Sequence, residues 1–319
     1  MSMATAQDAR RILHHVLEKL KDPECKYAEK YKSWIERSEG LEEALWKCLR
    51  KEVIRFLELG SWSVDAMRNI GGELKFDGRA IYLYGVLDSP PSQLLYLTRT
   101  YIGQSIQLSS RLRQHYNFRY RRDNPSLHYH AVQNSIFDVF SVLAVLPTPT
   151  NVLFPGNDEP PLLLNVMEMW CALLFSSLQP QMLREWLPDT ATPEPTGGLQ
   201  HSRAGALNIA NPLHHGLKSL SMDWLDLSHS VDPLIRDYLA HTDPENSSSV
   251  GPEKRGSAIE RVENASKAEK RMCPRWSPEV EPASVRTVAV IGVAVILGFV
   301  MLTRGVGLAR LRSGFGLRN

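Results

Sequence analysis

The spacing of the apolar residues changes once along this chain, near residue 75, and no other feature constrains the fold as strongly. Over residues 7–59 the apolar residues recur every three or four positions, which is the spacing of one face of an α-helix. Asp22-Pro23 interrupts this pattern, so we expect several short helices. From Ala80 onward, β-branched and aromatic residues form short runs that are typical of strands. The sequence therefore predicts a helical N-terminal unit over residues 1–72, followed by a domain that contains a sheet.

The chain after residue 75 is expected to mix strands and helices. Its runs predict a hairpin of strands over 80–87 and 94–101, a helix over 108–116, a loop over 119–130, a buried strand over 135–146 and an apolar helix over 162–178. We therefore predict an α+β fold in which a small α/β domain, a short sheet flanked by helices, occupies residues 75–215. An insertion at 188–204 and a short helical segment at 216–241 complete the predicted body.

Composition and charge exclude several classes of protein. The chain has 319 residues, of which 43% are hydrophobic and 23% charged, so collagen-like and wholly disordered chains are excluded. The four cysteines form no Cys-x-x-Cys pair, which argues against zinc clusters and against a disulfide framework. With 37 Lys and Arg against 35 Asp and Glu, the net charge is +2, so any attraction for nucleic acid must come from a local basic surface.

An uncharged run at residues 287–303 predicts a transmembrane helix. At a rise of about 1.5 Å per residue it would be about 25 Å long, the short limit for a bilayer span, with Arg286 and Arg304 at its ends. A buried helix of a soluble core is the alternative, but such a helix normally has a polar face, and this run has none. The polar residues 242–284 predict a disordered tether, and residues 304–319 form a basic tail without an acidic residue.

This layout predicts a single-pass, tail-anchored protein that meets the lipid bilayer through residues 287–303. No signal-like segment precedes the body, so we expect the body to face the cytosol or the nucleoplasm. The mitochondrial outer membrane, the endoplasmic reticulum and the nuclear envelope are all compatible with a short span and a basic tail.

Five polar residues after position 80 fall into a pattern of motifs. Tyr82 ends the run Ala-Ile-Tyr of the first predicted strand, and Tyr101 opens the run Tyr-Ile-Gly-Gln-Ser at the end of the second. Arg111 follows ten residues later, His115 four residues after that, and Glu168 lies on the later apolar helix. With this order of strands and helices, the segment from about residue 75 to residue 185 resembles the GIY-YIG endonuclease domain family.

The resemblance implies metal-dependent hydrolysis of a phosphodiester bond in DNA, with Mg²⁺ or Mn²⁺ as the cofactor. It implies that Glu168 holds the metal and that Arg111 neutralises charge that develops on the phosphate. It also implies that Tyr82, Tyr101 or His115 activates the attacking water, and the sequence does not rank the three.

The sequence departs from the family pattern at three places. Ala80 stands where the first motif has glycine, and the two tyrosines are nineteen residues apart, an excess that we assign to a loop over 88–93. The family's asparagine soon after the glutamate helix is missing, so Asn208 and Asn211 are the candidates for that role.

The residue types favour such a site even without the family. Arg111 and His115 lie four positions apart, so a helix would place them on one face, one turn apart. Glu168 is the only charged residue between positions 160 and 183, and a buried carboxylate needs a cation or hydrogen bonds. A divalent metal would meet that need, and so would a buried salt bridge with Arg111 or Arg113.

A run of arginines interleaved with aromatic residues predicts a surface for a phosphate backbone. A solvated loop is the alternative for its last part, and we expect the histidines at 128, 130, 214 and 215 to lie on the surface without a metal. The expected nucleic-acid-binding residues are Arg99, Arg113, Arg119, Arg121 and Arg122.

Two functions stay open at this point. The first is a membrane-anchored, metal-dependent endonuclease that acts on branched or otherwise structured DNA. The alternative is a catalytically inactive, membrane-tethered module that binds nucleic acid or protein through the same basic surface.

Overall fold

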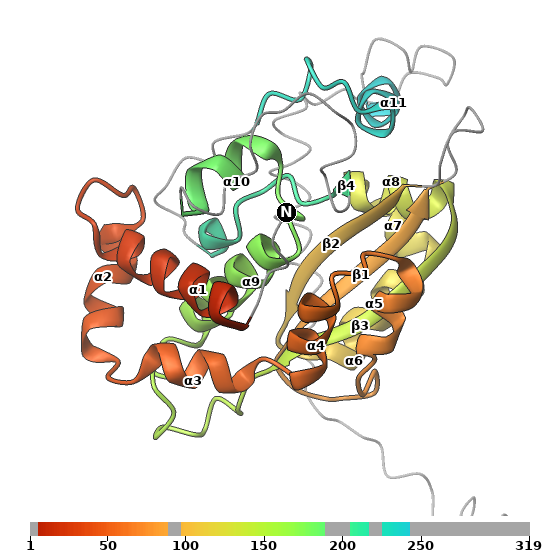
Figure 1. Ribbon diagram of the computed structural model, residues 1–319. Helices are drawn as coiled ribbons and strands as arrows, with labels where there is room; N and C mark the ends of the chain where they lie inside the picture. The colour runs from red at the N-terminus through yellow and green to blue at the C-terminus, as the bar shows by residue number, and fades with distance from the viewer. Residues whose placement is uncertain (1–5, 89–96, 189–204, 217–224, 243–319) are drawn as a thin grey trace, which may run out of the picture. The chain divides into compact units, whose positions relative to one another are not determined.

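The computed structural model of the chain describes residues 6–88, 97–188, 205–216 and 225–242. These residues belong to one compact unit with an α+β fold and a four-stranded mixed sheet (Figure 1). The predicted α+β class is therefore confirmed. The predicted tether, transmembrane helix, basic tail and insertion, and most of the long loop after position 88, lie outside the described residues. Among the described residues, no helix has both the length and the apolar character to cross a bilayer.

The helical N-terminal pattern is confirmed as a series of short helices. Ser63 caps the last of them by accepting a hydrogen bond from the backbone N–H of Ala66, and Gly40 and Gly60 adopt the left-handed conformation at helix boundaries. The helices are α1 (Ala6–Lys21), α2 (Ala28–Arg37), α3 (Leu41–Cys48), α4 (Lys51–Leu59) and α5 (Val64–Ile70).

The sheet is built around β1 and has the strand order β3-β1-β2-β4. β1 pairs antiparallel with β2 and with β3, whereas β4 pairs in parallel with β2 at Arg99 and Thr100. The second strand extends past the run predicted over 94–101 and ends at Ser105, which pairs with Ala80 at the start of β1, so the run Tyr-Ile-Gly-Gln-Ser forms the end of this strand as expected. The strands are β1 (Ala80–Asp88), β2 (Thr98–Ser105), β3 (Ser135–Val145) and β4 (Gly205–Ala206).

The segment after β2 contains more helix than the sequence predicts. The helix predicted over 108–116 is present, but the expected loop over 119–130 is wrong, because two further helices lie there. Asn117 and Ser126 cap them by accepting hydrogen bonds from backbone N–H groups of the first turns. The helices are α6 (Leu108–Tyr116), α7 (Phe118–Asp123) and α8 (Leu127–Asn134), then α9 (Pro160–Leu174), α10 (Pro180–Trp186), the 3₁₀ turn η2 (Pro212–His214) and α11 (Pro233–Thr242).

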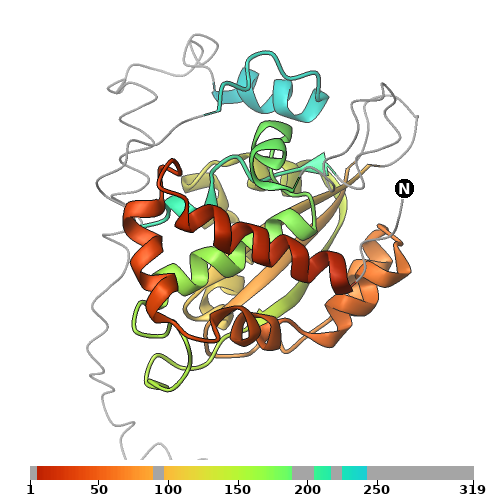
Figure 2. The same ribbon diagram turned by 60° about the vertical axis from the view of Figure 1, so that its left-hand side comes forward.

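The two faces of the sheet pack against different helices. Successive residues of a strand point to opposite faces, so Ile81 and Leu83 of β1 face one way and Tyr82 and Tyr84 the other. Ile81 and Leu83 share the main hydrophobic core with α1, α3, α4, α5 and α9, whereas Tyr82 and Tyr84 pack with Leu108 of α6. Figure 1 shows these helices on the two sides of the sheet, and Figure 2 shows α1 crossing α9.

Candidate functional site

The hydroxyl of Tyr82 lies at the centre of a buried network on the α6 face of the sheet. Arg111 on α6 donates a hydrogen bond from Nε to this hydroxyl over 3.1 Å, and Nε2 of His115 lies 2.8 Å from it. Tyr82 and His115 are completely buried, and Arg111 is half-buried. The four-residue spacing therefore places Arg111 and His115 against one phenol, as the helical geometry predicts.

Hydrogen bonds extend this network from Tyr82 to Ser126. A guanidinium can only donate, so the Tyr82 oxygen accepts from Arg111. Nδ1 of His115 lies 3.3 Å from Nε2 of His128, and Nδ1 of His128 lies 3.3 Å from the Ser126 hydroxyl. The hydrogen bonds from Tyr82 to Ser126 can run in either direction, because each imidazole nitrogen donates or accepts according to its tautomer.

The pKa values of these groups agree with neutral side chains. Burial lowers the pKa of His115 to about 2, and the nearby guanidinium of Arg111 adds to the effect. Burial raises the pKa of Tyr82, although Arg111 opposes the shift. Both shifts favour a neutral phenol beside a neutral imidazole over a tyrosinate beside an imidazolium. His115 is thus a neutral partner that orients the phenol.

Tyr101 joins the same network from β2. It lies directly across from Tyr84 in the strand register, and its ring stacks on the imidazole of His128 with the centroids 4.1 Å apart. Burial raises the pKa of Tyr101 well above its ordinary value. The expectation that His128 lies on the surface is wrong, because this side chain is buried between Tyr101 and His115.

Gly103 allows the closest approach in this network. A Cβ atom at this position would lie 2.5 Å from Cζ of Tyr82 and closer still to its hydroxyl. Gly103 lies inside β2, opposite Tyr82 in the register, and makes no turn there. The absence of a side chain at position 103 thus makes room for the Tyr82 hydroxyl beside β2.

Glu168 lies on α9, which packs on the opposite face of the sheet. Its side chain is buried, and its Oε2 atom has no hydrogen-bond partner in the part of the chain that the structure describes. Burial raises the pKa of Glu168, while His215, Gln104 and Arg111 each oppose the shift. The ion pair of Glu168 found among the described residues is with His215, whose Nδ1 lies 3.8 Å from Oε2, so the expected salt bridge with Arg111 or Arg113 is not found there.

Polar neighbours connect Glu168 to β2. Gln104 donates from Nε2 to Oδ1 of Asn165 over 2.8 Å, and the same Nε2 lies 3.1 Å from Nδ1 of His215. Asn165 lies one turn before Glu168 on α9. Gly103 therefore borders the Tyr82 network on one face, and the next residue, Gln104, contacts the surroundings of Glu168 on the other.

The five residues expected to form the site thus lie in two adjoining clusters. Tyr82, Tyr101, Arg111 and His115 make up the first, and Glu168 belongs to the second. The clusters influence each other electrostatically, because Arg111 lowers the pKa of Glu168 and Glu168 raises those of both tyrosines. The sequence patterns did not identify Gln104, Asn165, His128 and His215 as members of these clusters. Asn165 could have been found, because it is a second polar residue on the apolar helix and lies one turn from Glu168.

The expected basic surface includes one arginine that does not belong to it. Arg99 is 2% exposed and is bonded to the carboxylates of Asp88 and Asp232, so it has no free group for a phosphate. Arg121 is half-buried and donates to the backbone oxygen of His115. The exposed members of the predicted set are Arg113, Arg119 and Arg122.

The two candidate asparagines hold backbone in place. Asn208 accepts from the backbone N–H of Ile102 and donates to its carbonyl oxygen, which uses both ends of its amide. Asn211 caps η2 through the backbone N–H of Leu213. We therefore remove both from the set of reacting groups.

Comparisons of the chain with models of known protein families, with curated proteins and with solved structures find no match. Any function must accordingly be argued from the two clusters themselves.

Proposed function

We propose that this chain is a metal-dependent, GIY-YIG-like endonuclease that hydrolyses phosphodiester bonds in DNA. The proposal combines the motif pattern with the arrangement of Tyr82, Arg111 and Glu168 around the end of β2. The family assignment, the DNA substrate and the choice of Mg²⁺ or Mn²⁺ are parts of this proposal.

The observation that carries the proposal is the Oε2 atom of Glu168, which has no hydrogen-bond donor among the described residues and lies 3.8 Å from Nδ1 of His215. A buried carboxylate oxygen without a donor costs free energy unless a cation or a proton satisfies it. Its neighbours are a glutamine, an asparagine and an imidazole, which supply further oxygen and nitrogen donors but no fixed positive charge. These residues fit a divalent cation held by Glu168. When bound, such a cation supplies a Lewis acid for the phosphate oxygen.

The remaining roles follow from the first cluster. Arg111 carries a permanent charge that can bind a phosphate oxygen while its Nε keeps Tyr82 in place. His115 is in hydrogen-bond contact with the Tyr82 hydroxyl and fixes the orientation of the phenol. Of the three groups proposed to activate water, Tyr101 alone is half-buried, whereas Tyr82 and His115 are fully buried. We therefore place Tyr101 nearest to the substrate.

The test uses the purified full-length protein with duplex, flap and junction DNA in the presence of Mg²⁺. We expect cleavage that falls by at least about 100-fold in Glu168→Gln and in Arg111→Gln. Two exposed residues of α4 provide matched controls, Glu58→Gln and Arg55→Gln, which should cleave like the wild type. Circular dichroism checks that each variant is folded.

A second candidate is a binding module without catalytic turnover. The observation that favours it is the complete burial of Tyr82 and His115, which keeps both groups away from solvent in this arrangement. DNA binding without any Mg²⁺-dependent product would support this candidate and contradict the enzyme. The absence of both DNA binding and DNA cleavage would contradict the two candidate functions. The membrane anchor at 287–303 stays a prediction from the sequence.

A further inference from the structure

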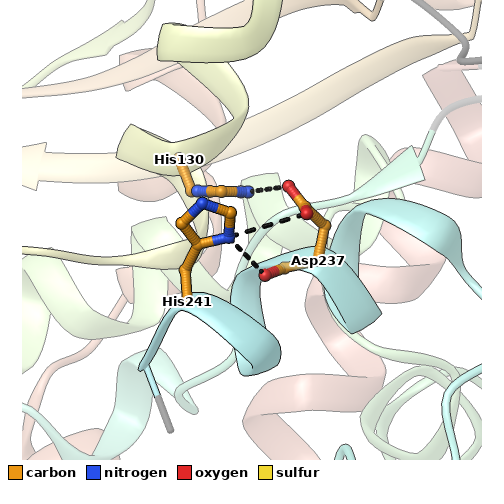
Figure 3. Close-up of side chains that lie close together, drawn as sticks. All are labelled: His130, Asp237 and His241. Carbon is orange, nitrogen blue, oxygen red and sulfur yellow. Dashed lines mark hydrogen bonds and ion pairs between the residues drawn. The ribbon is translucent and has the colours of Figure 1, made fainter. Parts of the chain in front are cut away.

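A separate group of side chains of the types that ligate metals lies between α8 and α11. His130 comes from α8, and Asp237 and His241 lie one turn apart on α11 (Figure 3). One ligand atom from each side chain can be chosen so that all three lie within 4.8 Å of one another. We propose that these three residues bind one Zn²⁺ ion that joins α11 to α8.

The carboxylate of Asp237 already faces both imidazoles. Nε2 of His130 lies 2.8 Å from Oδ2, and Nδ1 of His241 lies 3.6 Å from Oδ1 (Figure 3). The two imidazole rings are 5.2 Å apart between centroids. One nitrogen of each imidazole and one carboxylate oxygen are thus close enough to bind one ion, which would displace the protons by which these nitrogens bond the carboxylate and the backbone oxygen of Asp237. The single carboxylate of the set supplies a negative charge to offset a dication.

The donor types select the class of metal. Zn²⁺ binds imidazole nitrogen and carboxylate oxygen at about 2.0–2.2 Å, which puts neighbouring ligand atoms of a tetrahedral site about 3.3 Å apart. The side chain of His241 is 67% exposed and lies in the last turn of α11, so it has the freedom to close this gap by rotation. Mg²⁺ prefers oxygen ligands, so this site is distinct in its chemistry from the one proposed at Glu168.

The ion would reinforce the attachment of α11. The beginning of α11 is held by Asp232, which accepts two hydrogen bonds from Arg99, and by Leu234 and Ile235, which pack into a small core with α8. His241 lies at the other end of the helix, where the metal would add a second attachment.

Metal binding would also constrain the position of α8. His128 and His130 are two positions apart on α8 and so point to different sides, the first toward Tyr101 and the second toward α11. An ion at His130 would therefore stiffen the helix that holds His128 in the Tyr82 network. The metal site itself does not depend on the proposed nuclease activity.

The test uses full-length, untagged protein that has been treated with a chelator, because a polyhistidine tag would bind the same metals. Zn²⁺ is added in competition with a chromophoric chelator, and Co²⁺ serves as a spectroscopic probe of tetrahedral coordination. His241→Ala removes an exposed ligand, and Asp237→Asn keeps the shape of the side chain while removing its charge. His14→Ala is the control, because His14 is an exposed histidine that pairs with a glutamate on another helix.

We expect the wild type and His14→Ala to bind one Zn²⁺ at a site whose affinity falls by at least about 100-fold in His241→Ala and Asp237→Asn. Zn²⁺ should raise the Tm of the wild type and of His14→Ala, and it should leave the Tm of His241→Ala and of Asp237→Asn unchanged. The Co²⁺ complex of the wild type should show the intense visible bands of a tetrahedral site. Equal Zn²⁺ affinity in all four proteins, or no binding by the wild type at micromolar Zn²⁺, would overturn the proposal and leave His130 and Asp237 as a simple hydrogen-bonded pair.

Discussion

The hydroxyl of Tyr82 lies 2.8 Å from Nε2 of His115, and both side chains are completely buried. Burial and the neighbouring guanidinium of Arg111 both lower the pKa of His115, so its imidazole stays neutral in this network. A histidine that stays neutral when buried makes the stability of the protein depend on pH, and that stability decreases as the pH falls.

The first prediction concerns stability between pH 7.5 and pH 5. Unfolded His115 takes up a proton near its ordinary pKa of 6.5, whereas the folded residue does so only near pH 2. The unfolded state therefore binds more protons as the pH falls, and the free energy of unfolding decreases by about 2 kcal/mol over this range from this residue. We expect urea unfolding of His115→Gln to show a pH dependence weaker by that amount.

The raised pKa of Glu168 acts in the opposite direction, because it destabilises the folded state as the pH rises above its ordinary value of 4.5. Glu168 is present in the wild type and in His115→Gln, so its contribution to the pH dependence cancels to a first approximation when the two proteins are compared. The control is His14→Gln, which removes an exposed histidine outside the Tyr82 network. An unchanged slope in His115→Gln would mean that His115 is not held neutral.

The second prediction concerns Gly103→Ala. The new methyl group would lie 2.5 Å from Cζ of Tyr82, which is fully buried and has no room to move away. Since Gly103 lies in extended β2 backbone, the cost is steric, and we expect a loss of about 2 kcal/mol in the free energy of unfolding.

A double-mutant cycle with Tyr82→Phe tests the cause of that loss. Removal of the hydroxyl relieves part of the overlap, so Gly103→Ala should cost less in the Tyr82→Phe background. Equal costs in the two backgrounds, measured by urea unfolding, would show that the hydroxyl of Tyr82 does not lie against position 103.

The third prediction separates stability from activity at Glu168. Burial of this carboxylate, whose Oε2 has no hydrogen-bond donor among the described residues, destabilises the folded protein, so Glu168→Gln should raise the free energy of unfolding by about 1 kcal/mol in the absence of metal. Millimolar Mg²⁺ should raise the Tm of the wild type and leave that of the variant unchanged. If Glu168→Gln instead lowers stability, Glu168 serves as a structural ion pair with His215.

Much of this fold could be predicted from the sequence, because its strands and its long apolar helix have strong local patterns. β1, β3 and α9 are marked by apolar runs, and the expected helix at 108–116 is present as α6. α7 and α8 could not be recognised in the same way, since their sequence is polar and aromatic. They begin at capping residues, Asn117 and Ser126, whose role depends on the geometry of the chain before them.

The candidate site was predictable in its members but not in its arrangement. The spacing of Arg111 and His115 on a helix gives their common direction, whereas the position of Glu168 on the other face depends on how α9 packs. The partners of Arg99 illustrate the same limit, because Asp232 lies 133 positions away in the chain. No local pattern in the sequence connects those two residues.

The last prediction compares this buried arginine with the exposed ones. Arg99→Met leaves the carboxylates of Asp88 and Asp232 without their partner, and both are only partly exposed to water. We expect it to lower the free energy of unfolding by about 2–3 kcal/mol, below the full cost of a completely buried pair. Its affinity for DNA, measured below the unfolding transition, should equal that of the wild type.

The double variant Arg119→Gln and Arg122→Gln should behave in the opposite way. Both side chains are exposed, so the free energy of unfolding should change by less than about 0.5 kcal/mol. If both contact phosphates, DNA binding should weaken, and the slope of log affinity against log salt concentration should decrease by about 1.8, which is 0.9 for each lost contact. A slope equal to that of the wild type would place the nucleic-acid surface elsewhere on the protein, because counterion release reports only those charges that meet the DNA backbone.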